Sequence, residues 1–381
     1  MRVRRFLRRL VVIVILWFLF ITACHQMVVD FVNFILKDGV DTDQRAGRPP
    51  RLILTLNTDF DQSHLGGCSR CNCNITNDAS QFDAADAVIL DVIGGRQELD
   101  DLSAVVQRRR PEQLFVFFAQ ESPAYWDAEE LYPNFYNLTM GYRRDSDVPS
   151  PYGYTIKRNQ ARKVVPLSEE RLGSKTRPIA WFVSNCRTPS AREDYVKQLQ
   201  KHIQVDVYGR CGQLNCPKPP SQCNQLLRER YRFYLAFENS VCTDYITEKF
   251  WNQGYQSDVV PIVLKRSLVE RYVPPHSFLA ADDFESPAKL ASHISALMQD
   301  DVAYNKLLTS WRRYYDVIYL DGVKHDRREQ PWGFCRLCDL LWTEPRRKRI
   351  KTNLLEWWHE ANVCDNGLAG RLLDTRRAAH T

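Results

Sequence analysis

Residues 233–264 read FYLAFENSVCTDYITEKFWNQGYQSDVVPIVL, in which two apolar runs flank a polar segment. The runs at 233–238 and 259–264 are continuously hydrophobic rather than alternating, which is typical of parallel strands buried on both faces. Parallel strands need a long crossover connection, and the segment between the runs is long enough to contain a helix. This stretch therefore predicts a strand–helix–strand unit of an α/β fold.

The connecting helix is expected to point its N-terminus at the end of the first strand. Thr243 or Asp244 is a plausible N-cap, and Ile246, Phe250 and Gly254 would then share the helical face that packs against the sheet. The amides at such a helix N-terminus attract an anion into the crevice at the carboxyl ends of the strands.

Four side chains of this segment have the chemistry that such a crevice requires. Lys249 and the Thr247 hydroxyl suit a phosphate or diphosphate. Glu238 can accept hydrogen bonds from ribose hydroxyls, and Glu248 can oppose a developing positive charge. A capped surface helix with an adjacent Glu–Lys pair has the same pattern, so the pattern alone leaves both interpretations open.

The alternation of apolar runs and longer polar stretches continues outward in both directions. Helices are expected at 97–110 and 191–203. Strand–helix alternation in both halves predicts two α/β domains with parallel sheets and a ligand in the cleft between them. The further runs interpreted as buried strands are RLILTLN (51–57), AVILDV (87–92), QLFVFFA (113–119), PIAWFVS (178–184) and QVDVYG (204–209).

The N-terminal end is predicted to be a membrane anchor. Residues 10–29 read LVVIVILWFLFITACHQMVV, which is long enough to span the hydrocarbon core as a helix. Five arginines among the first nine residues should stay in the cytoplasm, so the C-terminal bulk would face the lumen. A cleaved signal peptide is the alternative, but the run is longer than a typical signal-peptide core and lacks a convincing cleavage site.

The chain is expected to be a single-pass membrane protein with two luminal domains. A polar stretch at 157–177 is the candidate linker between them. The expected organisation is a cytoplasmic tail (1–9), a transmembrane anchor (10–29), a stem (30–50), a first α/β domain (51–165), a second α/β domain (166–345) and a C-terminal tail (346–381).

Charge and short motifs exclude several function classes. The five N-terminal arginines account for most of the net charge of +6, so the rest of the chain is nearly neutral and offers no electrostatic case for nucleic acid. The chain lacks the glycine-rich dinucleotide fingerprint, a P-loop, a His-Glu-x-x-His zinc motif and a Gly-x-Ser-x-Gly elbow. The simplest dehydrogenase, nucleotide triphosphatase, zinc protease and α/β-hydrolase interpretations are thereby removed.

The cysteines and two sequons fit an oxidising lumen. Asn74-Ile-Thr76 and Asn137-Leu-Thr139 are candidate N-glycosylation sites. Cys335-x-x-Cys338 together with the cluster at 68–73 could bind zinc, but disulfides are the better interpretation in that compartment. Eleven cysteines follow the anchor, so at least one thiol stays free or pairs between chains.

The segment FYLAFENSVCTDYITEKFW, followed by VVPIVL, resembles the donor-binding signature of the α1,3-fucosyltransferases, the GDP-fucose-dependent enzymes of glycosyltransferase family 10. The resemblance covers roughly residues 110–345. The predicted membrane topology is similar to that of a single-pass type II enzyme of the Golgi membrane. The flanking matches are Glu121-Ser122-Pro123, YRRDSD (142–147), Pro151-Tyr152-Gly153, FVSNC (182–186) with Arg192 and Tyr195, VYGRCG (207–212), PPHSF (274–278) and Asp283-Phe284.

This resemblance implies a GT-B fold of two Rossmann-like domains that transfers fucose with inversion. Glu121 would be the general base towards the acceptor hydroxyl, and Glu248 would stabilise the oxocarbenium-like sugar. Arg192 and Lys249 would hold the diphosphate and take over the role of a metal. The residues implied to bind the donor are Ser184, Asn185, Arg192, Tyr208, Tyr234, Glu238, Asn239, Tyr245, Thr247, Glu248 and Lys249.

The same comparison bears on metals, disulfides and partners. Asp145-Ser146-Asp147 looks like a metal motif but lies in the half opposite the donor site, so no metal is expected to be obligatory, with Mn²⁺ or Mg²⁺ at most stimulating. Family architecture implies bridges from Cys335 and Cys338 to the cluster at 68–73, and one between Cys186 and Cys242. The expected partners are GDP-fucose, a glycoprotein acceptor, the membrane and a second copy in a possible homodimer.

The acceptor is expected to be the innermost GlcNAc of N-glycan cores. Residues 94–112 depart from the acceptor segment of Lewis-type members, and the additional cysteines resemble the invertebrate and plant branch. Lewis-type fucosylation of antennal LacNAc or LacdiNAc is the alternative. Two rival hypotheses are a glycosyltransferase that uses another sugar nucleotide and an inactive Golgi glycan-binding or scaffold protein.

Overall fold

The computed structural model describes residues 47–56, 58, 60–66, 68, 71–91, 107–125, 134–216, 220–321, 332–343, 350–360 and 363–374. The predicted anchor at 10–29 and most of the helix expected at 97–110 lie outside these residues. Within them, no helix has the length and apolar character needed to cross a bilayer. Residues Arg51–Thr381 form one unit.

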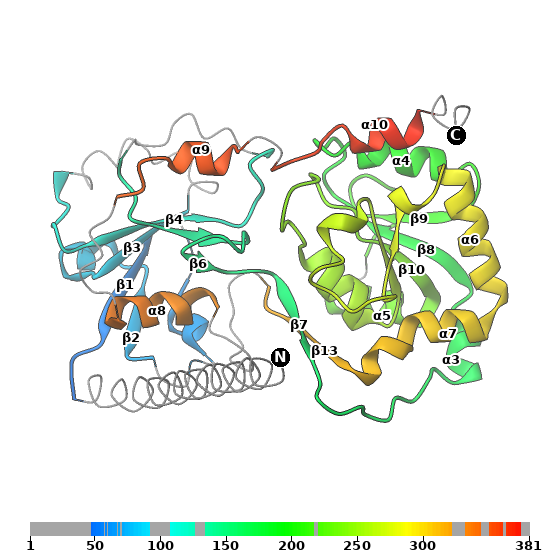
Figure 1. The fold of residues 1–381 in the computed structure, drawn as a ribbon, viewed down its shortest axis with the longest axis horizontal. Coiled ribbons are helices and arrows are strands. Elements are labelled where there is room, and N and C mark those ends of the chain that lie inside the picture. Colours follow the sequence, from blue (N-terminus) through cyan, green and yellow to red (C-terminus); the bar gives the residue numbers. More distant parts are fainter. Residues whose placement is uncertain are drawn as a thin grey trace, which may run out of the picture. The chain divides into compact units, whose positions relative to one another are not determined.

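The first sheet has six strands in the order β2-β1-β3-β4-β5-β6, and all of its pairings are parallel (Figure 1). The predicted strands at 51–57, 87–92 and 113–119 are confirmed as β1, β3 and β4. Its strands are β1 (Arg51–Leu56), β2 (Cys73–Thr76), β3 (Ala87–Asp91), β4 (Leu114–Ala119), β5 (Leu138–Gly141) and β6 (Val148–Pro149).

The second sheet has five strands in the order β12-β11-β10-β8-β9, again all parallel. Four predicted strands are confirmed here, including both runs of the 233–264 stretch. The strands are β8 (Arg177–Phe182), β9 (Val205–Tyr208), β10 (Tyr231–Leu235), β11 (Val260–Val263) and β12 (Leu279–Ala280). The α/β class with parallel sheets is thus confirmed.

An antiparallel pair of strands and several helices complete the described fold. β7 (Gly153–Lys157) pairs with β13 (Tyr315–Tyr319), so the polar linker predicted at 157–177 begins where β7 ends. The helix predicted at 191–203 is confirmed as α4. The helices are α3 (Glu169–Ser174), α4 (Arg192–Leu199), α5 (Pro220–Arg230), α6 (Pro287–Gln299), α7 (Asp301–Thr309), α8 (Gly333–Thr343), α9 (Leu354–Trp358) and α10 (Leu368–Leu373).

Both faces of the first sheet are covered, as continuous hydrophobicity requires. All six residues of β4 are buried. Phe115 and Phe117 pack on the face that α9 covers, while Val116 and Phe118 pack on the face that α8 covers (Figure 1). The apolar side chains of α8 thus belong to the core of the first sheet, although the sequence groups residues 166–345 as the second domain. The domain boundaries themselves remain a prediction.

Five disulfides join described cysteines, and they both confirm and correct the expected pairings. Cys335 bonds to Cys68 and Cys338 bonds to Cys73, as the family architecture implies. The bridge expected between Cys186 and Cys242 is wrong, because these residues bond instead as Cys186–Cys211 and Cys242–Cys364. A further bridge joins Cys216 and Cys223. Cys186 follows β8 and Cys242 follows β10, and each is bonded to a different part of the chain.

The disulfides also argue against a zinc site at these cysteines. The sulfur atoms of Cys68, Cys71 and Cys335 lie within 4.8 Å of one another. Zinc needs thiolate ligands, and two of these three sulfurs are consumed in a disulfide. The cluster is therefore a covalent link between the first sheet and α8.

The C-terminal segment is paired with the polar stretch that follows β10. Cys242 and Cys364 form an antiparallel bridge, in which the Thr243 amide donates to the Val363 carbonyl and the Asp365 amide donates to the Val241 carbonyl, both at 2.7 Å. Beyond it, Leu368 and Ala369 of α10 enter the core that α4 shares with the second sheet. Residues 363–369 therefore pack against the second sheet and the loop that follows β10.

The two sequons differ sharply in accessibility, and we expect a glycan on only one of them. Asn74 is exposed on the edge strand β2. Asn137 is 4% exposed, and its Oδ1 accepts hydrogen bonds from the Phe115 amide at 2.8 Å and from Arg109 at 2.7 Å. A glycan on the Asn137 amide nitrogen would not fit in this buried position, and moving the side chain out to accommodate it would break these bonds.

Peptide mapping measures this directly. The fragment 47–381, secreted with a foreign signal peptide and treated with peptide N-glycosidase in ¹⁸O water, should carry the isotope at Asn74 and not at Asn137. N74Q should fold with an unchanged melting temperature, whereas N137Q should melt at a lower temperature. Isotope at Asn137 in folded protein would contradict the expectation.

Candidate active site

Polar residues follow three parallel strands at their carboxyl ends. Glu121 follows β4, Ser184 and Asn185 follow β8, and Glu238 follows β10. The carboxyl ends of parallel strands are where ligands bind in open α/β sheets, because loops and helix N-termini converge there. The two sheets thus present their candidate site residues at the edges where the fold class predicts them.

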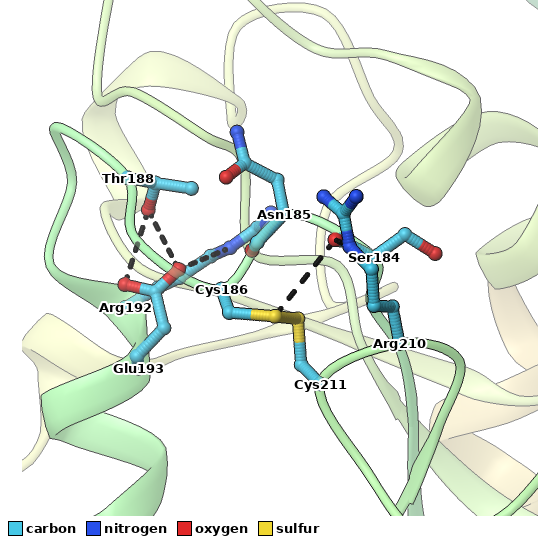
Figure 2. Close-up of a disulfide and its surroundings, with 8 residues drawn as sticks. All are labelled: Ser184, Asn185, Cys186, Thr188, Arg192, Glu193, Arg210 and Cys211. Atoms are coloured by element: carbon cyan, nitrogen blue, oxygen red, sulfur yellow. Dashed lines mark hydrogen bonds and ion pairs between the residues drawn. A yellow bond between two sulfur atoms is a disulfide. The ribbon is translucent and has the colours of Figure 1, made fainter.

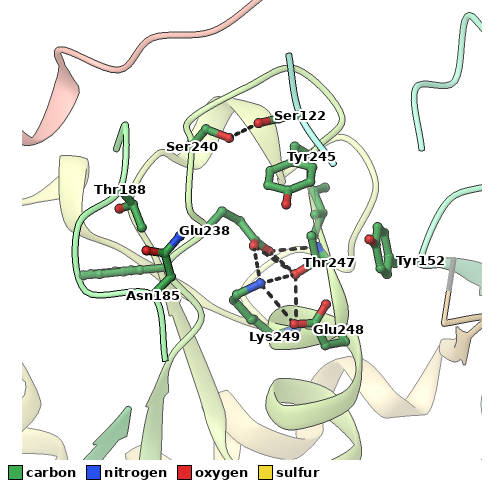
Figure 3. A network of polar contacts seen from close by, with 12 residues as sticks. Ser122, Tyr152, Asn185, Thr188, Glu238, Ser240, Tyr245, Thr247, Glu248 and Lys249 are labelled. Atoms are coloured by element: carbon green, nitrogen blue, oxygen red, sulfur yellow. Dashed lines mark hydrogen bonds and ion pairs between the residues drawn. The ribbon is translucent and has the colours of Figure 1, made fainter. Parts of the chain in front are cut away.

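The densest polar network joins Glu238 to residues nine to eleven positions later in the chain (Figure 3). The Glu238 carboxylate accepts from the Thr247 amide at 2.8 Å and from the Thr247 hydroxyl at 2.9 Å. The Lys249 ammonium lies 3.0 Å from Glu238, 3.0 Å from Glu248 and 2.9 Å from the Thr247 hydroxyl oxygen. Four of the residues expected at the donor site are therefore brought together by direct contacts.

Burial and charge set the ionisation of this cluster. Burial alone would lower the pKa of Lys249, but the carboxylates of Glu238 and Glu248 outweigh it and raise that pKa above its ordinary value. Burial raises the pKa of Glu238 despite the nearby ammonium. At Glu248 burial is outweighed by the Lys249 charge and hydrogen bonds, so its pKa is lowered. The cluster thus retains a charged lysine beside an ionised Glu248, whose side chain is 37% exposed.

The helix of this segment begins later than the sequence predicts. A π-helix, η4 (Lys249–Gly254), has Glu248 as its N-cap, so the N-cap predicted at Thr243 or Asp244 is wrong. Asp244 instead has a positive φ of 62°, and its carboxylate accepts from the Arg144 amide at 3.0 Å. An N-cap at Asp244 would bind the Thr247 amide through its own side chain, but Glu238 binds that amide instead. The expected packing of Ile246 and Phe250 against the second sheet is confirmed.

Arg192 links the loops that follow β8 and β10. It opens α4 and is 2% exposed. Its guanidinium donates to the Phe237 carbonyl at 2.5 Å and to the Asn185 carbonyl at 3.3 Å. In this structure the arginine therefore fixes two loop backbones next to the Glu238 cluster, and its predicted contact with a diphosphate remains a prediction.

A disulfide fastens the loop after β8 to the loop after β9 (Figure 2). Cys186 bonds to Cys211, and Arg210 donates to the Ser184 carbonyl at 2.8 Å. The loop after β8 also reaches the loop after β10, since the Ser190 amide donates to the Asn239 carbonyl at 2.9 Å. Ser184, Asn185 and Asn239 are thereby held on loops that are tied to their neighbours.

Two tyrosines expected in the donor pocket lie deep in the second sheet. Tyr234 is 1% exposed and contacts the ring of Phe182. Tyr208 is 8% exposed, and its hydroxyl shares a 2.7 Å hydrogen bond with that of Tyr231. The structure therefore places both tyrosines in the core of the second sheet. Neither takes part in the hydrogen bonds and ion pairs described above for the Glu238 cluster.

Two residues that follow β4 form hydrogen bonds with the segment after β10. The Tyr245 hydroxyl donates a 2.5 Å hydrogen bond to the Glu121 carboxylate. One residue along, the hydroxyls of Ser122 and Ser240 share a short hydrogen bond (Figure 3). Both serines are buried. Sequence reasoning gave these serines no role, and 118 positions separate them, so only their adjacency to Glu121 and Glu238 could have indicated one.

Tyr152 is a further residue to which the sequence assigned no role beyond its motif. It is near Thr247 and Glu248 (Figure 3), and its hydroxyl donates to the Gln120 carbonyl at 3.1 Å. Its side chain contacts the cores of both sheets. Tyr152 therefore packs between the two cores, close enough to Glu248 and Glu121 for their charges to raise its pKa further beyond the effect of burial.

The carboxylates of the Asp145-Ser146-Asp147 motif bind protein groups. Asp145 forms a 2.7 Å ion pair with Arg143 and accepts from the Trp357 indole at 3.0 Å. Asp147 accepts from the Thr139 amide at 2.9 Å and lies 3.0 Å from the Lys351 ammonium. These contacts give the motif a structural role that ties β5 to residues 350–360.

Comparisons with known proteins show the family of this chain. A family model described as "Fucosyltransferase, N-terminal" matches residues 48–153, and one described as "Glycosyltransferase family 10 (fucosyltransferase) C-term" matches residues 172–358. The Caenorhabditis elegans "Alpha-(1,3)-fucosyltransferase fut-1" is 42% identical over 327 residues, which cover 85% of this chain and 72% of that relative. A human "4-galactosyl-N-acetylglucosaminide 3-alpha-L-fucosyltransferase FUT6" is 37% identical over 294 residues, which cover 75% of each chain.

Solved structures are similar at lower identity. A crystal structure of an α1,3-fucosyltransferase with GDP-fucose has a TM-score of 0.49 and 18% identity, with 78% of this chain and 92% of that chain covered. The family assignment depends instead on the two models and on relatives well above 30% identity. On that ground the chain belongs to glycosyltransferase family 10, the α1,3-fucosyltransferase family, and is an enzyme.

Proposed function

We propose that this enzyme transfers L-fucose from GDP-β-L-fucose, with inversion, to the 3-hydroxyl of a GlcNAc residue. The observation that supports this most is the network in which Lys249 and Glu248 share one ion pair at the carboxyl end of β10. A diphosphate leaving group develops negative charge while the sugar develops positive charge. Adjacent residues of opposite charge suit both.

The proposed reaction transfers one proton, forms one bond and breaks one bond. Glu121 takes the proton of the acceptor hydroxyl as the acceptor oxygen bonds to the anomeric carbon, while the bond from that carbon to the diphosphate breaks and GDP leaves. Lys249 and Arg192 would stabilise the departing charge, and Glu248 would face the sugar. This assignment uses a GT-B arrangement in which the site lies in the cleft between two Rossmann-like domains.

The acceptor proposed is the innermost GlcNAc of the N-glycan core. The 42% identity with the nematode enzyme, and the additional disulfides at Cys186 and Cys242, favour the invertebrate and plant branch. The alternative is transfer to antennal LacNAc, which the printed name of the human relative supports. Type II anchoring through residues 10–29, a Golgi location, a luminal catalytic part and homodimerisation remain predictions.

A glycan panel tests donor and acceptor together. Fragment 47–381 is incubated with GDP-fucose and biantennary N-glycans that have either a free or a blocked core, alongside LacNAc and LacdiNAc. A deoxyhexose on the chitobiose core supports the proposal, and one found only on antennae supports the alternative. Folded protein that neither transfers nor hydrolyses GDP-fucose would instead favour an inactive scaffold. Competition by UDP but not GDP would favour another sugar nucleotide.

We expect catalysis to proceed without an obligatory metal. Lys249 and Arg192 supply two cations near the proposed diphosphate site, and Asp145 and Asp147 are already engaged by protein cations. After exhaustive chelation with EDTA and buffer exchange, the initial rate should stay within about twofold of the rate before chelation. Added Mn²⁺ or Mg²⁺ should raise the rate without being required for it. A loss of activity that only divalent ions restore would contradict this.

A further inference from the structure

Building on the proposed function, we propose that Tyr245 is a positioning residue for Glu121 in the acceptor-activating step. The sequence assigned this tyrosine to the donor pocket. In the structure its hydroxyl donates a 2.5 Å hydrogen bond to the carboxylate of Glu121. Glu121 follows β4 of the first sheet, whereas Tyr245 follows β10 of the second. A base must lie within hydrogen-bond reach of the proton that it takes, so whatever orients its carboxylate affects the rate.

Tyr245 is built to hold one geometry. It is 4% exposed, and its ring packs edge-on against Tyr142 with centroids 5.0 Å apart. Burial, and then the negative charge of Glu121, raise the pKa of the Tyr245 phenol well above its ordinary value. The phenol therefore stays protonated and can only donate to the carboxylate.

The backbone around Tyr245 is fixed on both sides. Cys242 is bonded to Cys364, and the carboxylate of Asp244 accepts from the Arg144 amide and from the Tyr272 hydroxyl. Two residues later, the Thr247 amide is bound to Glu238. The segment that supplies the groups for the donor thus also sets the position of the base. Distances from Glu121 and from Glu248 to the reacting atoms are coupled through residues 245–248.

A double-mutant cycle separates this role from donor binding. Y245F removes only the hydroxyl. We expect kcat for transfer to fall by roughly 10- to 100-fold, as for loss of one hydrogen bond to a charged group, with KM for GDP-fucose and the calorimetric Kd for GDP unchanged. In the E121Q background, Y245F should have almost no further effect, because the residue through which it acts is already impaired.

Tyr142 supplies the matched control. Among the described residues its buried hydroxyl has no hydrogen-bond partner, although its ring touches that of Tyr245. Y142F should therefore leave kcat and KM within about twofold of their values. Folding of all variants is compared by melting temperature.

The outcomes distinguish this inference from the function on which it depends. If E121Q retains full activity, Glu121 is not the base and the proposed mechanism fails first. If E121Q is inactive but Y245F behaves like Y142F, only the positioning role is overturned. A rise in KM for GDP-fucose with unchanged kcat in Y245F also overturns it and returns Tyr245 to the donor pocket. If Y245F lowers kcat by the same factor in the wild-type and E121Q backgrounds, the positioning role is also overturned.

Discussion

Replacement of Glu121 by Gln is expected to lower kcat for fucose transfer by roughly 10²- to 10⁴-fold, the range that a positioned general base contributes. The amide is nearly the same size as the carboxylate and can still accept the hydrogen bond from Tyr245. It cannot take a proton from the acceptor hydroxyl at neutral pH. The Kd for GDP should be unchanged, since Glu121 follows a strand of the first sheet and the donor cluster belongs to the second.

E112Q is the matched control for this variant. Glu112 precedes the same strand and is exposed, so its loss should leave kcat within about twofold of its value. Initial rates with saturating acceptor and GDP-fucose, together with calorimetric binding of GDP, measure both predictions. A fully active E121Q enzyme would falsify the assignment of the base.

The second large effect is expected at Lys249. K249M removes the cation that lies 3.0 Å from both Glu238 and Glu248. Without it the departing diphosphate loses a positioned charge, and kcat should fall on the order of 10²- to 10³-fold, as for loss of an electrostatic stabiliser of the transition state. GDP should also bind more weakly, because two carboxylates then face the anion.

Removing one partner of a buried ion pair also destabilises a protein, and a second variant separates the two effects. In K249M/E238Q one of the two carboxylates left without the lysine is replaced by a neutral amide, so the melting temperature should recover in part while kcat stays low. K197M, which replaces an exposed lysine of α4, should change neither. Recovery of kcat in the double variant would mean that Lys249 serves the fold rather than the reaction.

The strands were predictable because their signal is local. β4 reads as a continuous apolar run, and such a run needs cover on both faces whatever the rest of the chain does. Strands β2, β5, β6, β7, β12 and β13 were missed, because none of them lies in a continuous apolar run as long as that of β4. The membership of α8 in the first core was equally invisible, because an apolar helix face does not reveal which sheet it covers.

The site could be predicted residue by residue but not contact by contact. Glu238, Thr247 and Lys249 were all expected, and they meet. The helix start was misplaced because local capping rules cannot include a carboxylate that arrives from nine residues earlier. The expected bridge between Cys186 and Cys242 was wrong for a related reason. Cys186 and Cys242 both flank donor loops, but a bond depends on distances in space, and the partner of Cys242 lies 122 residues away.

That separation has a consequence for biosynthesis. A growing polypeptide contains Cys242, Glu248 and Lys249 well before residues 363–365 have been translated. Until then residues 241–243 have neither the amide and carbonyl partners of the bridge nor the sulfur of Cys364. Residues 241–243 thus gain these partners only after the strands of both sheets have been synthesised. Quality control that senses the Cys242 thiol would therefore act on a chain that already contains every strand of the two sheets.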